Sequence, residues 1–135
     1  MIVDLEDKEE SGSFELKGGG KVHLRLMSRK DIKEIRDATT TVVSEYPLLG
    51  EGKDAKYQRF EAEKVDVELL MEMRLDRNIT GWDGLFDRNE KPIPVTKENK
   101  VLLMVMVPEF REAVDDGLAA LKKAEMDRAE QLEKN

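Results

Sequence analysis

Residues 14–26 read FELKGGGKVHLRL, in which apolar and polar side chains alternate on both sides of three consecutive glycines. Alternation with a period of two is typical of a strand that is buried on one face only. Glycines 18–20 can adopt the positive φ angles of a tight turn, which most other residues avoid. The sequence therefore predicts a β-hairpin with strands over 14–16 and 22–26.

Outward from the hairpin, the N-terminal side is acidic and lacks a clear period. Residues 1–12 carry five carboxylates, namely Asp4, Glu6, Asp7, Glu9 and Glu10. This composition predicts a flexible acidic lead-in over residues 1–12. We find no internal repeat and no linker, so residues 13–125 are interpreted as a single domain, and residues 126–135 as the polar end of a C-terminal helix.

Two helices are predicted on the C-terminal side of the hairpin. Ser28 and Asp31 resemble a capping box, and apolar residues then recur at helical spacing as far as Tyr46, which predicts a helix over 29–46. Pro47 ends that helix. A second apolar stripe predicts a helix over 54–77.

The last third of the chain begins with turn signals. A second short hairpin is predicted around residues 83–95, because two prolines keep Lys91–Val95 extended. Thr96 is a natural N-cap for a helix over 97–107, and Pro108 suits the first position of a terminal helix. The predicted class is α+β and mainly helical, with about four helices and two hairpins.

Composition excludes several classes of function. The 135 residues include no cysteine and a single histidine, His23, so neither a cysteine-ligated nor a multi-histidine zinc site is possible. A net charge of −7 disfavours nucleic acid as a partner. No nucleophile, base and oxyanion set converges, so we assign no catalytic residue, metal or cofactor and expect a protein that is not an enzyme. The start of the chain lacks a signal peptide and the longest apolar run is short, which predicts a cytoplasmic protein without a membrane partner.

One stretch resembles a calcium-binding loop. Asp76, Asn78, Thr80 and Asp87 stand at positions 1, 3, 5 and 12 around Gly81 at position 6, as in an EF-hand. The aspartate at position 12 and the prolines that follow are atypical, since an EF-hand continues into a helix. A small acidic calcium-responsive adaptor is therefore kept as an alternative.

Apolar residues in the second half point to protein binding. The segment Val101–Val107 is apolar on all sides, so as a helix it needs cover from the core, from a partner or from another copy of the chain. Trp82, the only tryptophan, is either a local core residue or an exposed anchor. The candidate partner-binding residues are Leu70, Met73, Trp82, Leu102, Leu103, Met104, Met106 and Phe110.

Several of these motifs together resemble the tail assembly chaperones of long-tailed bacteriophages. They are Ile79-x-Gly81-Trp82-Asp83-Gly84-x-x-Asp87, then Pro92-Ile93-Pro94-Val95-Thr96-x-Glu98-Asn99, Leu102-Leu103 and Pro108-Glu109-Phe110. In that family a Trp-Gly turn, a short hairpin, a Pro-x-Pro strand, a Thr-led helix and a Pro-led terminal helix follow in this order. The likeness covers about residues 65–125.

The resemblance implies a non-enzymatic phage or prophage protein in the cytoplasm of the bacterial host. Such a chaperone coats the tape-measure protein during tail assembly and is absent from the finished tail. It also implies self-association into a homo-oligomer and, through a longer frameshifted product in many members, the tail-tube protein as a further partner. A head-tail connector or another structural virion protein is the other alternative.

Overall fold

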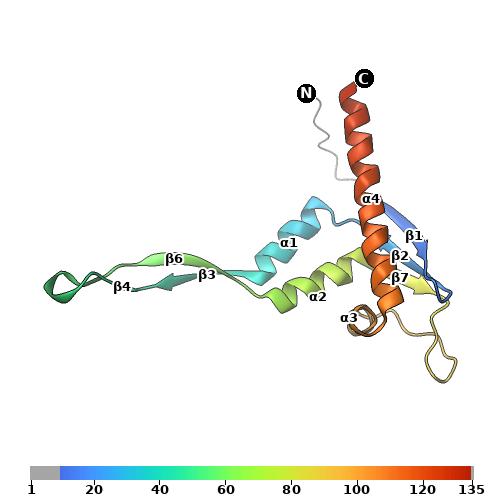
Figure 1. Ribbon diagram of the computed structural model, residues 1–135, viewed down its shortest axis with the longest axis horizontal. Coiled ribbons are helices and arrows are strands. Elements are labelled where there is room, and N and C mark those ends of the chain that lie inside the picture. The colour runs from blue at the N-terminus through green and yellow to red at the C-terminus, as the bar shows by residue number, and fades with distance from the viewer. Residues whose placement is uncertain (1–9, 135) are drawn as a thin grey trace.

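The computed structural model describes residues 10–134 (Figure 1). The elements follow in the order β1 (Ser11–Glu15), β2 (Lys21–Arg25), α1 (Arg29–Thr39), β3 (Thr40–Glu45), β4 (Leu48–Leu49), the 3-10 turn η1 (Gly52–Asp54), β5 (Lys56–Tyr57), β6 (Phe60–Val65), α2 (Val67–Asn78), β7 (Ile79–Asp83), α3 (Lys97–Met106) and α4 (Pro108–Lys134). The α+β class with four helices and an N-terminal hairpin is confirmed.

The predicted hairpin is the start of a three-stranded antiparallel sheet. β1 pairs with β2, and β2 pairs on its other side with β7, so the order is β1-β2-β7. The glycine turn is closed by the Leu16 amide, which donates to the Gly20 carbonyl over 3.0 Å. β1 already begins at Ser11, whereas the sequence placed residues up to 12 in a flexible lead-in; residues 1–9 of that lead-in lie outside the described part.

The core lies between this sheet and α4. Val22 and Leu24 of β2 point to the same face of the sheet and pack with Phe110 and Val114 of α4, all of them buried. At Gly117 the helix comes so close to the sheet that a Cβ there would lie 2.6 Å from the Leu24 Cδ1 atom. A glycine is therefore what permits the close packing of α4 on β2.

The helices predicted over 29–46 and 54–77 were wrong at the end of the first and in the first half of the second. α1 ends at Thr39 and α2 begins only at Val67, and the residues between form strands. β3 pairs antiparallel with β6 from Thr40↔Val65 to Glu45↔Phe60. The physical reason lies in the run Thr39–Val43, five consecutive β-branched residues that favour an extended backbone.

Residues 40–65, called the arm below, project from the rest of the molecule as a two-stranded ribbon (Figure 1). The ribbon continues from β3 and β6 through β4 and β5 to a tip with positive φ at Gly50 and Gly52. Its base is closed by the Asp66 amide, which donates to the Thr39 carbonyl over 2.8 Å. Consequently, both ends of the arm are held by helices of the body, α1 on one side and α2 on the other.

The C-terminal third follows the predicted order. The Thr96 hydroxyl caps α3 by accepting from the Asn99 amide, and Pro108 begins α4. Between β7 and α3, a turn over residues 85–93 is closed by the Ile93 amide bonding to the Leu85 carbonyl, with one bridge between Phe86 and Pro92. The second hairpin is thus a single bridged turn and not a pair of strands.

None of the helices in residues 10–134 combines the length and the apolar character that crossing a membrane requires.

Candidate partner-binding surface

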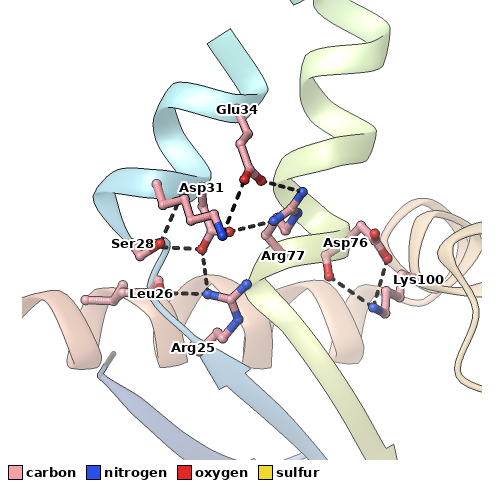
Figure 2. A network of polar contacts seen from close by, with 9 residues as sticks. Arg25, Leu26, Ser28, Asp31, Glu34, Asp76, Arg77 and Lys100 are labelled. Atoms are coloured by element: carbon pink, nitrogen blue, oxygen red, sulfur yellow. Dashed lines mark hydrogen bonds and ion pairs between the residues drawn. The ribbon is translucent and has the colours of Figure 1, made fainter. Parts of the chain in front are cut away.

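The position of α3 is fixed by a buried lysine. Lys100, in the second turn of α3, donates from its Nζ atom to the Asp76 carbonyl over 3.1 Å and to the Asp76 carboxylate over 3.0 Å (Figure 2). Asp76 lies in the last turn of α2, where unpaired carbonyls and the helix dipole favour a cation. This contact fixes which side chains of α3 face outward.

Three apolar side chains of α3 face solvent. Leu102, Val105 and Met106 are 52%, 64% and 71% exposed, and their spacing of three and four residues places them on one side of the helix. Leu102 and Met106 also line a groove of about 390 Å³ whose other wall includes Ile93 and Pro94. We call these three side chains and the groove the α3 surface.

The structure places the predicted binding residues in three regions: on α3, in the core and on α2. Leu102 and Met106 are exposed on the α3 surface, while Leu103 and Met104 are half-buried on the same helix. Val105 was not among the predicted residues, although its place in the apolar run could have indicated it.

Trp82 and Phe110 are buried, so the expectation that they lie on a partner-binding surface needs correction. The Trp82 indole donates to the Ile93 carbonyl over 2.9 Å and meets the Phe110 ring edge to face, with 5.8 Å between the ring centroids. This pair joins β7 to α4, and the hydrogen bond from Trp82 holds the backbone of Ile93, which lines the groove. Its role is in the core.

Leu70 lines a different groove, at the base of the arm. That groove of about 330 Å³ lies between α1 and α2 and is lined mostly by apolar side chains and two arginines: Met27, Ile32, Ile35, Arg36, Thr39, Thr40, Val65, Leu70 and Arg74. Met73, on α2, is half-buried, and Met71, which was not predicted, is exposed. The predicted residues of α2 therefore do not join the α3 surface in one groove.

A buried carboxylate holds α1 and α2 together at this base. Asp31 accepts from Arg25 of β2 over 2.6 Å through one oxygen and from Arg77 of α2 over 2.7 Å through the other (Figure 2). The same carboxylate accepts from the Ser28 amide as part of the predicted capping box, and Arg77 also pairs with Glu34 over 3.1 Å. Because α1 and α2 carry the two strands of the arm, this cluster sets the direction in which the arm leaves the body.

The environment of Asp31 favours its charged form. The hydrogen bond from Arg25 is the main cause that holds the pKa of the Asp31 carboxyl well below its ordinary value, and the Ser28 hydrogen bonds act in the same direction. Burial opposes them. Asp31 is therefore ionised at neutral pH and stays so below the ordinary pKa of an aspartate.

His23 connects three strands of the sheet. Its Nδ1 atom lies 2.6 Å from the Ser13 hydroxyl on β1, and its Nε2 atom lies 2.7 Å from the Asp83 carboxylate on β7. The residues near His23 in the sequence include no acidic partner that predicts this contact, because Asp83 is 60 residues away. Serine, histidine and aspartate in a line resemble a hydrolase triad. The Asp83 side chain is 77% exposed, however, and water weakens the polarisation that such a triad requires, so we interpret the contacts as cross-strand pairs.

The stretch that resembles an EF-hand has another structure. Residues 79–83 form strand β7, and the Asp76 carboxylate is occupied by Lys100. The twelve residues therefore do not form a loop around a common centre, which removes the sequence argument for calcium binding. Within residues 10–134, no three acidic or histidine side chains are grouped so that they could hold a metal ion.

Comparison with protein families, with curated proteins and with solved structures found no match to this chain.

Proposed function

We propose that this protein is a non-enzymatic tail assembly chaperone of a long-tailed phage or prophage, which binds apolar helical segments of the tape-measure protein through the α3 surface. The observation that carries the proposal is the contiguous exposure of Leu102, Val105 and Met106 beside a groove. Apolar side chains grouped in this way on a protein with 39% charged residues are costly in water unless a partner covers them.

The shape of the surface suits a helix as the partner. A helix that is laid beside α3 can insert one or two apolar side chains, spaced by three or four residues, between Met106 and Ile93. Methionine adapts to side chains of different shape, which suits a chaperone that covers many similar but unequal segments of one long partner. The net charge of −7 would keep the coated partner dispersed.

The order of the elements supports the same proposal. The tryptophan strand, the bridged turn, the extended Pro92–Pro94 segment, the Thr96-capped helix and the Pro108-led helix follow one another as the resemblance implies. Three of these segments line the groove of the α3 surface: the bridged turn with Asp87, the extended segment with Ile93 and Pro94, and the Thr96-capped helix with Leu102 and Met106. Part of the motifs that carry the resemblance therefore also line the candidate site.

The test compares two methionines of similar exposure. We expect Met106→Glu to abolish co-purification with the tape-measure protein of the same phage or prophage, because a carboxylate would be buried against apolar side chains. Met126→Glu on α4 is the matched control, since Met126 is 63% exposed but lies away from the groove, and it should bind as the unchanged protein does. Equal binding by both variants would show that α3 is not the contact surface.

A second experiment distinguishes a chaperone from a structural virion protein. Tail particles purified from a lysate are probed with an antibody against this chain. A chaperone is found in the assembly fraction and is missing from mature tails, whereas a head-tail connector remains in them. Presence of the chain in mature particles, at a level comparable to that of a tail protein, contradicts the chaperone proposal.

A further inference from the structure

The arm is the largest part of the structure that the proposed function leaves unused. It is a two-stranded ribbon, and none of its side chains from Thr41 to Lys53 is buried. Two strands alone are at best marginally stable in water, whereas three or more strands with an apolar face are stable. Further strands from another chain would therefore stabilise the arm.

The two strands of the arm differ in how their free edges are protected. β6 carries Glu61, Glu63 and Lys64 among its six residues, and charged side chains on an edge strand prevent pairing with further strands. β3 reads TTVVSE, with four consecutive β-branched residues and a single charge, Glu45, at its end. The edge of β3 is thus the unprotected one.

The hydrogen-bond pattern shows which backbone groups lie along that edge. The Asp66 amide bonds to the Thr39 carbonyl, and the Gln58 amide bonds to the Pro47 carbonyl, so the odd-numbered residues of β3 face β6. The N–H and C=O groups of Thr40, Val42 and Ser44 consequently point to the outer edge. These residues provide a regular ladder that a further antiparallel strand can use.

We propose that β3 pairs antiparallel with β3 of a second copy of this chain, which forms a four-stranded sheet in the order β6-β3-β3-β6 about a two-fold axis. Two identical edges that meet in this way close the assembly as a dimer. This dimer is independent of the α3 surface and does not rest on the chaperone function.

The charges of the chain favour a second copy as the occupant of this edge. Four basic and five acidic residues give the arm a net charge of −1, which leaves −6 of the total −7 on the rest of the chain. The net charge at the contact is therefore small, and the projection of the arm keeps the two bodies apart (Figure 1).

The register of the pair avoids like charges as well. When the two-fold axis passes through Val42 or Val43, Glu45 lies opposite an uncharged threonine of the second copy, Thr39 or Thr41. In both registers valine side chains from the two copies come together at the centre. The edge of β3 is therefore compatible in charge with a second copy of itself.

The test uses opposite charges at one position. In sedimentation velocity, the full chain is expected at twice the 15.5 kDa monomer mass. Val42→Lys and Val42→Glu should each raise the dimer dissociation constant roughly tenfold or more, because like charges then meet across the axis. An equal mixture of the two variants should dimerise again, since opposite charges now face each other.

The control changes the same residue type on the other strand. Val65 of β6 is 47% exposed, compared with 65% for Val42, and Val65→Lys should leave the dimer intact. Far-UV circular dichroism of each variant checks that the body is folded. A monomeric wild-type chain, dissociation by Val65→Lys but not by Val42→Lys, or failure of the mixed variants to recover would each overturn the proposal. Dissociation by Met106→Glu alone would place the second copy on α3 instead.

Discussion

At the scale of single residues, Asp31 joins more of the structure than any surface contact does. It links β2 through Arg25, α2 through Arg77 and the start of α1 through Ser28. When either the buried carboxylate or one of its cationic partners is removed, the remaining charge in the interior is uncompensated. Its removal therefore affects stability and the direction of the arm together.

We expect Asp31→Asn to lower the free energy of unfolding by about 3 kcal/mol at neutral pH, because Arg25 and Arg77 then lose their shared anion. Urea unfolding measures this loss. Glu34→Gln is the control in the same cluster, since Glu34 is partly exposed and pairs with Arg77 over 3.1 Å and with Lys30 over 3.9 Å, and its substitution should cost less than about 1 kcal/mol.

The same substitution should change how stability depends on pH. The pKa of the Asp31 carboxyl is lowered in the folded state, so its contribution is complete above the ordinary pKa of about 3.9 and is lost as the pH falls below it. The difference between the unchanged protein and Asp31→Asn should therefore shrink between about pH 5 and pH 2. A difference that stays constant over this range would show that Asp31 is not charged in the fold.

Single residues also show where sequence reasoning was reliable. Ser28, Thr96 and Pro108 were correctly placed at helix starts because capping depends on neighbours within four residues. Leu102 and Met106 are exposed, because a helix that is apolar on all sides must expose part of itself. Phe110 was wrongly placed on the partner-binding surface, and of the two interpretations of Trp82 the core one holds, because the burial of both depends on how α4 packs on β7, which no local pattern encodes.

At the scale of elements, the strands of the arm were not predicted from the sequence. Glu61–Lys64 has helix-forming residues, and Val42, Val43 and Tyr46 fall at spacings that also fit a helix. Pairing of β3 with β6 overrides these local preferences. The run of β-branched residues from Thr39 to Val43 was the available signal, and it would have placed the end of the first helix correctly.

The arm should be dispensable for the fold of the body. We expect that replacing residues 41–64 by a short Gly-Ser turn changes the free energy of unfolding by about 1 kcal/mol or less, because the removed side chains make few contacts with the core. Urea unfolding of the shortened chain, at a concentration at which the unchanged chain is monomeric, measures the change. A shortened chain that fails to fold would show that the arm supports α1 and α2 and is not merely carried by them.

At the scale of the whole molecule, most of the net negative charge lies outside the arm. The chain outside the arm carries −6 and the arm −1, and the proposed dimer brings the arms together while the bodies remain at a distance. Repulsion between the bodies is long-ranged and is screened by salt, whereas backbone pairing in the arms is short-ranged.

Association should consequently strengthen as salt is added. We expect the dimer dissociation constant to fall between low and physiological ionic strength, when it is measured by sedimentation at several sodium chloride concentrations. The opposite trend, with salt dissociating the dimer, would mean that ion pairs hold the two copies together, which the sparse charges of β3 do not provide.

The closed base of the arm has a consequence for motion. Thr39 and Asp66 are joined by a backbone hydrogen bond, so the ribbon leaves and re-enters the body at one point, and Asp31 clamps the helices on both sides of that point. The ribbon can therefore melt and re-form while the body stays intact. One small chain then contains two cooperative units. Amide hydrogens of the arm exchange with solvent at a rate that differs from that of the body, and pairing with a second copy would lower the exchange rate of the arm.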